Sequence, residues 1–315
     1  MAAKKKEKKK ILFLMMVYDN GLLMKEYDIL MKHYYKMKKK HKLDNIEIYG
    51  YTSGKEVGYD ADKHLFTFVC SGEESNLLTY EKTKRMFAYA LDNKEFDFVY
   101  RTNTSTFTNI LLLDKLVQET NIADDDVYCS DIYVRLNDER NIQEIYGRGN
   151  SILYPRALVK KIAQSDIQSP EQIGLTADDD TIGVILAEGT KYHQYWCEWF
   201  MCAPNENELW GNMDYSLGNL GRQIAIQCRN YFKRELEPIF LSYLANVFEN
   251  EYKCNKKYLT QLTKELDRPV CVWVTSLNID IHNEVNGYYT IDPQTGQFQR
   301  HGYDIKEIKA IKYGE

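Results

Sequence analysis

The segment from Phe96 to Phe107 constrains the fold more than any other part of the chain. It begins with aromatic and β-branched residues, Phe96 to Arg101, that predict a short buried strand. The chain becomes polar from Thr102 to Thr106, and apolar residues then recur at helical spacing from Phe107 to Leu116. A strand that runs through a polar loop into a helix is typical of open α/β sheets, whose ligands lie beyond the strand ends. We therefore expect a binding site beside this loop, the alternative being an ordinary connection that binds nothing.

The same alternation of strands and helices extends over the first 120 residues. Ile11–Val17 is apolar on both faces, as in a central parallel strand, and further strands are expected over 46–51 and 65–70. Helices are expected from Leu23 to Tyr34 and from Thr79 to Leu91. This order predicts a Rossmann-type, mostly parallel sheet flanked by helices. The glycine-rich motifs GxGxxG and GxxxxGK[ST] are absent, which argues against a dinucleotide oxidoreductase or a P-loop NTPase.

Three consecutive carboxylates, Asp178 to Asp180, precede an apolar helical pattern. Capping and the helix dipole explain one or two such residues. Because adjacent like charges repel one another, three in a row suggest that one carboxylate serves a chemical step. The alternative is that all three only cap the helix.

The later part of the chain is aromatic and then helical. We expect most aromatic residues between 192 and 210 to be core, and Trp196 and Trp210 to lie on the side of an acceptor. A long helical region is predicted from Leu217 to Phe248, followed by a strand at 270–274 and a turn at 292–296. We divide the chain into a basic, disordered tail (1–10), an α/β domain (11–250) and an α+β extension (251–315) packed on it.

Composition restricts the class of protein further. The chain has 315 residues, a formal net charge of −5, and seven cysteines without CxxC pairs or zinc spacing. The apolar run after the basic N-terminus is short and lacks a cleavage site, and no run reaches the length of a membrane span. We expect a soluble, cytoplasmic protein without a transmembrane segment.

Three segments together resemble one family, the fringe-like and β-1,3-galactosyltransferase-like glycosyltransferases of the GT-A fold. Phe96–Phe107 is similar to the family's strand and metal-binding loop, which often reads YDFLLKTDDDVF. Arg148–Ile162 resembles the strand and helix that contact substrate, and Asp178–Gly183 resembles the helix start EDVxxG or DDCTxG, which supplies the catalytic base. The resemblance spans residues 11 to 245 and is to a bacterial or viral relative.

The resemblance implies a hexosyl- or pentosyltransferase that moves a sugar from a nucleotide-sugar donor to an acceptor hydroxyl. A UDP-sugar is the first choice of donor, and a glycan or another hydroxyl compound is the acceptor. It makes Asp179 the catalytic base, with Asp178 the alternative, and we expect Asp180 to face solvent or cap the helix. Asp19 and the end of the strand at 46–51 are candidates for the nucleoside, and Arg101, Arg148 and Arg222 for the diphosphate. Tyr18, Asn103 and Ser105 are further donor-binding candidates.

The chain departs from the family at the aspartate triplet, where it has Asn103, Thr104 and Ser105. A hydroxyl is a poor substitute for a carboxylate on Mn²⁺ or Mg²⁺. Three alternatives follow from this degenerate motif. The reaction is metal-independent and arginines neutralise the diphosphate, or Asp19 or Asp124–Asp126 holds the metal, or the chain no longer catalyses transfer.

Two other functions remain open. The chain is then a non-catalytic nucleotide-sugar or glycan-binding protein on a degenerate scaffold, or a DNA-modifying sugar transferase. A DNA-modifying transferase would have to bind nucleic acid through the basic clusters Lys4–Lys10 and Lys36–Lys42. The net charge of −5 provides no global basic field for nucleic acid.

Overall fold

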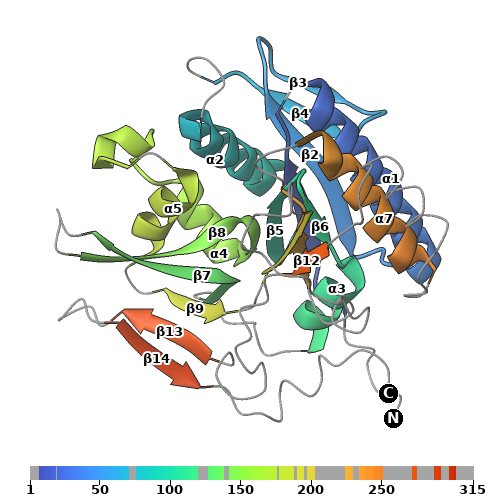
Figure 1. Cartoon of the computed structure of the whole chain (residues 1–315). Coiled ribbons are helices and arrows are strands. Elements are labelled where there is room, and N and C mark those ends of the chain that lie inside the picture. Colours follow the sequence, from blue (N-terminus) through green and yellow to red (C-terminus); the bar gives the residue numbers. More distant parts are fainter. Residues whose placement is uncertain are drawn as a thin grey trace, which may run out of the picture.

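The computed structural model describes residues 7–18, 20–70, 76–119, 127–137, 142–175, 177–187, 190–194, 197–202, 224–229, 234–250, 272–274, 287–291 and 298–302. Ten strands form one sheet in the order β14-β13-β9-β7-β8-β5-β1-β2-β4-β3 (Figure 1). These strands are β1 (Ile11–Met16), β2 (Ile46–Ser53), β3 (Gly58–Asp60), β4 (Leu65–Phe68), β5 (Phe98–Asn103), β7 (Val127–Asn137), β8 (Ile142–Pro155), β9 (Lys191–Gln194), β13 (Gly287–Ile291) and β14 (Phe298–Gly302).

A second sheet of four strands has the order β12-β10-β11-β6. Its strands are β6 (Thr106–Thr108), β10 (Cys197–Cys202), β11 (Ala225–Gln227) and β12 (Val272–Val274). The α-helices are α1 (Gly21–His41), α2 (Asn76–Asn93), α3 (Ile110–Glu119), α4 (Arg156–Ala163), α5 (Asp178–Leu186) and α7 (Glu237–Glu249). The 3₁₀-helices are η1 (Pro170–Ile173) and η2 (Arg234–Leu236).

The centre of the large sheet is parallel. Strands β5, β1, β2 and β4 pair in parallel. Helix α1 joins β1 to β2 and α2 joins β4 to β5, whereas the short strand β3 lies between β2 and β4. Outside this centre, β8 runs antiparallel to β5 and to β7, while β9 returns to a parallel pairing with β7. The α/β class is therefore confirmed, with a parallel centre and antiparallel flanks.

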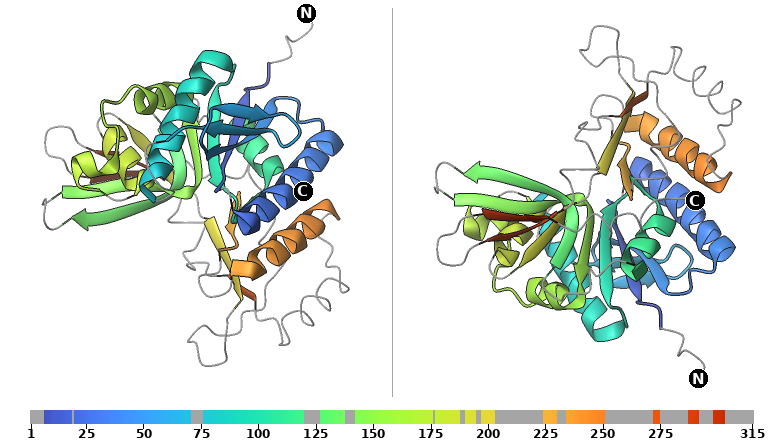
Figure 2. Two further views of the ribbon diagram at one scale, coloured as in Figure 1. Left: turned by 90° about the horizontal axis from the view of Figure 1, so that it is seen from above. Right: turned by 90° about the horizontal axis from the view of Figure 1, so that it is seen from below.

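Strand β1 explains why helices cover both faces of this centre. Its side chains alternate between two hydrophobic clusters, and all six residues are buried. Phe13 and Met15 pack with apolar residues of α1, α3 and α7, whereas Leu12 and Leu14 pack with residues of α2, α4 and α5. Figures 1 and 2 show these two helical layers on opposite sides of the central strands. A strand that is apolar on both faces is stable only when both faces are covered.

Helix α1 follows β1 directly. The Asn20 side chain accepts a hydrogen bond from the backbone of Leu23 at 2.9 Å and so caps the helix, as its residue type predicts. The helix ends at Lys42, which is in the left-handed conformation, after a last turn rich in lysine. Helix α7 packs alongside α1, although the two are far apart in the sequence (Figure 2).

Two predicted helices are corrected by the structure. The helix expected from Phe107 begins at Ile110, because Thr106–Thr108 forms β6 and pairs with β11. The region from 217 to 248 is not one helix: its described residues contain β11, η2 and α7. Phe107 and Ile226 are register partners and both are buried, so a long-range strand pairing prevails over local helical propensity.

The ends of the chain are described only in part. Residues 1–6 lie outside the described residues, whereas the backbone N–H of Lys9 donates to Gln118 at 2.9 Å and that of Lys10 to Asp97 at 2.6 Å. Beyond residue 250, β12 pairs with β10 and β13 pairs with β9, while the turn at 292–296 lies outside the described residues. The division of the chain at residue 250 stays a prediction. No helix in the described part of the chain is long and apolar enough to cross a membrane.

Candidate functional site

A cavity of about 620 Å³ lies at the carboxyl ends of β1 and β5, where open α/β sheets bind ligands. Tyr18 and Asn20 follow β1, and Asn103 ends β5. The opposite wall comes from β8 and from the start of α5. The cavity is lined by Met16, Tyr18, Asn20, Leu23, Thr79, Arg101, Asn103, Thr104, Ser105, Tyr146, Arg148, Gly149, Asn150, Ala177, Asp178, Asp179, Gln227, Arg229 and Arg234.

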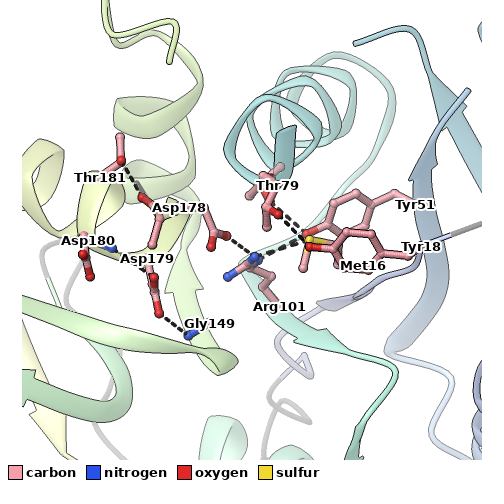
Figure 3. A network of polar contacts seen from close by, with 12 residues as sticks. Met16, Tyr18, Tyr51, Thr79, Arg101, Gly149, Asp178, Asp179, Asp180 and Thr181 are labelled. Atoms are coloured by element: carbon pink, nitrogen blue, oxygen red, sulfur yellow. Dashed lines mark hydrogen bonds and ion pairs between the residues drawn. The ribbon is translucent and has the colours of Figure 1, made fainter. Parts of the chain in front are cut away.

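Arg101 connects β5 to the acidic run on α5 (Figure 3). Its fully buried guanidinium forms an ion pair with Asp178, and its Nε donates to the Tyr51 hydroxyl at 3.2 Å. The Tyr51 hydroxyl also lies 3.0 Å from Thr83 Oγ1. A buried charge is tolerated only when it is paired and hydrogen-bonded. Arg101 is predicted to bind the donor diphosphate, and this prediction is not tested by the ion pair that its guanidinium forms with Asp178.

One nitrogen of this guanidinium, Nη1, is buried and has no hydrogen-bond partner among the described residues. A β-carbon added to Gly149 would lie 2.7 Å from Nη1. Glycine at this position therefore leaves room for the arginine beneath strand β8.

Asp179 is placed differently from its neighbour Asp178. Its Oδ2 accepts a hydrogen bond of 3.3 Å from the backbone N–H of Gly149, and the residue lines the cavity (Figure 3). Protein atoms surround most of the carboxyl group, and this burial, with the negative charges of Asp178 and Asp180, raises the pKa of Asp179 to about 7. Arg101 and the Gly149 N–H act in the opposite direction. Asp179 thus titrates near neutral pH.

Asp180 corrects one expectation. It is buried rather than exposed to solvent, and the N-cap of α5 is Ala177, so Asp180 is not the capping residue either. As a buried residue one position further along α5, it adds a negative charge beside Asp179. The start of α5 at Asp178 agrees with the helix start predicted from the acidic run.

The loop after β5 is closed by its own hydrogen bonds. Asn103 Oδ1 accepts from Ser105 Oγ at 3.2 Å and from Thr106 Oγ1 at 2.9 Å, and the Ser105 carbonyl accepts from the Cys228 N–H at 2.7 Å. The loop offers only neutral oxygens, which do not fit a divalent cation held by carboxylates. Within the described residues, no group of three or more His, Cys, Asp or Glu side chains is arranged to hold a metal. The alternative metal carriers Asp19 and Asp124–Asp126 lie outside the described residues.

The structure thus brings together Tyr18, Arg101, Asn103, Ser105, Arg148, Asp178 and Asp179 from the predicted set. Arg148 lies 3.3 Å from Asp131, measured from its Nε to the carboxylate oxygen. The other four predicted site residues, Asp19, Arg222, Trp196 and Trp210, lie outside the described residues.

Several residues on the cavity wall were not among the predicted site residues. Asn150 donates to Gln227 at 2.9 Å and joins β8 to β11, and Arg229 and Arg234 follow β11 on the same wall. The basic residues of this segment were visible in the sequence but were assigned to a helix. The sequence did not predict the strand β11, and this strand brings Gln227 and the arginines that follow it to the cavity.

The fold and the cavity together define an α/β protein with an arginine- and aspartate-lined cavity at the carboxyl ends of its central parallel strands. No protein-family model matches the chain, and no curated protein matches it. Among solved structures, it is similar to the mannosyltransferase PcManGT from Pyrobaculum calidifontis in complex with GDP-Man and Mn²⁺. That match has a TM-score of 0.35 and 11% identity, and covers 83% of this chain and 81% of that chain. This likeness is too low to place the chain in a family.

Proposed function

We propose that the chain is a GT-A-type glycosyltransferase, related to the fringe-like family, that binds a nucleotide sugar in this cavity. Its donor is a UDP-sugar, and it transfers the hexosyl or pentosyl group to a hydroxyl of a glycan or another acceptor. The observation that carries this proposal is Asp179, a carboxyl group on the cavity wall whose pKa of about 7 suits proton transfer near neutral pH.

Asp179 acts as the general base in this proposal. When ionised, it accepts the proton of the acceptor hydroxyl while the acceptor oxygen bonds to the anomeric carbon and the bond to the diphosphate breaks. Asp178 is less suitable because its carboxylate is paired with the buried Arg101. Both aspartates line the cavity, but Arg101 engages Asp178, so Asp179 is the better candidate for the base.

The diphosphate leaves with two or more negative charges, which the site must stabilise. The arginines on the cavity wall are suited to stabilise this charge, because a guanidinium can donate two parallel hydrogen bonds to phosphate oxygens. The described residues of the loop after β5 do not fit a metal, so no step is assigned to one here.

The test is turnover of a panel of nucleotide sugars by wild type, Asp179→Asn and Asp62→Asn. The exposed Asp62 lies at the β3–β4 turn, away from the cavity, and serves as the control for loss of one carboxylate. We expect Asp179→Asn to lower kcat by about 10²-fold or more with little change in the donor KM. In wild type, kcat/KM should rise with pH through about 7, because protonated Asp179 cannot accept a proton. Undiminished turnover in Asp179→Asn would remove the base from this position.

A second function, a non-catalytic binding protein, is favoured by one observation. The loop after β5 is closed by its own hydrogen bonds and carries no carboxylate in place of the family's aspartates. A thermal-shift screen against UDP, GDP, CMP and TDP separates the two functions when combined with the turnover assay. Binding without turnover of any donor would favour the binding protein.

A further inference from the structure

Three arginines that line the cavity form ion pairs with described carboxylates, and Arg234 is the most exposed of the three. Its side chain is 38% exposed, against 24% for Arg148 and none for Arg101. It belongs to η2, between β11 and α7, and lines the cavity. A partly exposed guanidinium at this position is suited to an anionic group of a ligand.

Glu237 fixes the orientation of this arginine. Its Oε1 accepts from Arg234 Nε at 3.0 Å and its Oε2 from Nη2 at 3.1 Å, a two-point contact that uses one edge of the guanidinium. Glu237 itself is fully buried and starts α7, where a carboxylate is favoured by the helix dipole. The remaining edge, formed by Nη1 and the second N–H of Nη2, is not used by these two hydrogen bonds.

A second acidic residue, Glu26 on α1, interacts electrostatically with Glu237 and Arg234. It is fully buried, and among the described residues neither of its carboxyl oxygens has a hydrogen-bond partner of good geometry. Burial, followed by the neighbouring Glu237, raises the pKa of Glu26 to about 8, while the Thr104 hydroxyl and Arg234 lower it. At neutral pH Glu26 therefore keeps its proton, and Glu237 is the carboxyl group that contacts Arg234.

We propose that Arg234 binds the diphosphate of the donor through the guanidinium edge that the two hydrogen bonds to Glu237 leave unused, and that Glu237 is the positioning residue that presents it. This inference rests on the nucleotide-sugar donor proposed above. It changes the assignment of the diphosphate from Arg101, which is engaged with Asp178, to a residue that the sequence did not single out.

The test compares three ligands by calorimetry on the full chain: UDP, uridine and inorganic pyrophosphate. Removing a residue that binds the diphosphate weakens the binding of UDP and pyrophosphate but leaves the binding of uridine unchanged. General damage to the site weakens the binding of all three ligands. The variants are Arg234→Met, Arg234→Lys and Glu237→Gln. The control is Arg85→Met, since Arg85 on α2 donates through Nε and Nη2 to Glu81 in a similar way but lies outside the cavity.

We expect Arg234→Met to raise the Kd of UDP and of pyrophosphate about 10- to 100-fold, the range for hydrogen bonds to charged groups, and to leave the Kd of uridine unchanged. The Kd values of Arg234→Lys should lie between those of wild type and Arg234→Met, because lysine keeps the charge but cannot donate two parallel hydrogen bonds. Glu237→Gln replaces one acceptor by an amide N–H and should raise the Kd of UDP by a smaller factor than Arg234→Met does. Arg85→Met should match wild type.

The possible failures are distinguishable. If wild type binds UDP and Arg234→Met binds it equally well, the inference is wrong and the proposed function stands. If wild type binds pyrophosphate through Arg234 but no nucleotide, the diphosphate site stands and the nucleotide-sugar donor is wrong. If wild type binds none of the three ligands, both are wrong. If Arg234→Met weakens UDP but Glu237→Gln does not, Arg234 keeps its role and Glu237 is not a positioning residue.

Discussion

Glu26→Gln should make the stability of the protein less sensitive to pH between about 5 and 8. Glu26 has a pKa of about 8 in the folded chain, against a reference value of 4.5. Between these values the native state holds one proton more than the unfolded state. The contribution of Glu26 to stability is therefore fully present below about 4.5 and is lost as pH rises through about 8.

The magnitude follows from the pH interval. One proton of difference lowers the free energy of unfolding by about 1.4 kcal/mol for each pH unit. From pH 5.5 to the folded pKa of about 8, the loss in wild type is about 3 kcal/mol. Glutamine has nearly the same shape and stays neutral, so the variant lacks this loss. Contributions of titrating groups that do not interact with Glu26 cancel in the difference between the variant and wild type.

The assay is urea unfolding of wild type, Glu26→Gln and Glu56→Gln at pH 5.5, 7.0 and 8.5. Glu56 is exposed in the loop before β3 and controls for the loss of a glutamate as such. Glu26→Gln should gain about 3 kcal/mol relative to wild type between pH 5.5 and 8.5, whereas Glu56→Gln should follow wild type. If the difference between Glu26→Gln and wild type were the same at all three pH values, Glu26 would not be protonated in the native state.

Two further predictions concern the cavity. Gly149→Ala should destabilise the fold by about 1–3 kcal/mol in urea unfolding, because its β-carbon would lie 2.7 Å from Arg101 Nη1 and press the guanidinium away from Asp178; unchanged stability would mean that the arginine has room to move. If the chain transfers sugar, turnover should survive EDTA, because Asn103, Thr104 and Ser105 carry no charge for a divalent cation; complete loss restored by Mn²⁺ would reveal a metal held elsewhere in the chain.

Local sequence determined the elements nearest the cavity. The apolar run at Ile11–Val17 became β1, the segment after Phe96 became β5 and its polar loop, and the acidic run became the start of α5. Each of these has a cause within a few residues: an apolar pattern on both faces, a change to polar residues, or carboxylates at a helix start. Such causes are visible without knowledge of any distant partner.

The tertiary structure alone decided which charged groups are paired and which face the cavity. Arg101 is engaged by Asp178, Asp180 is buried, and Glu237 holds Arg234 beside Glu26. The partners in these contacts come from different strands and helices, and burial and charge act on a group only through neighbours that the fold brings to it. For the same reason, β11 forms by pairing with β6 although its surroundings in the sequence predict a helix. Sequence alone therefore indicated where the cavity lies, whereas the roles of its charged residues depend on contacts between segments that are distant along the chain.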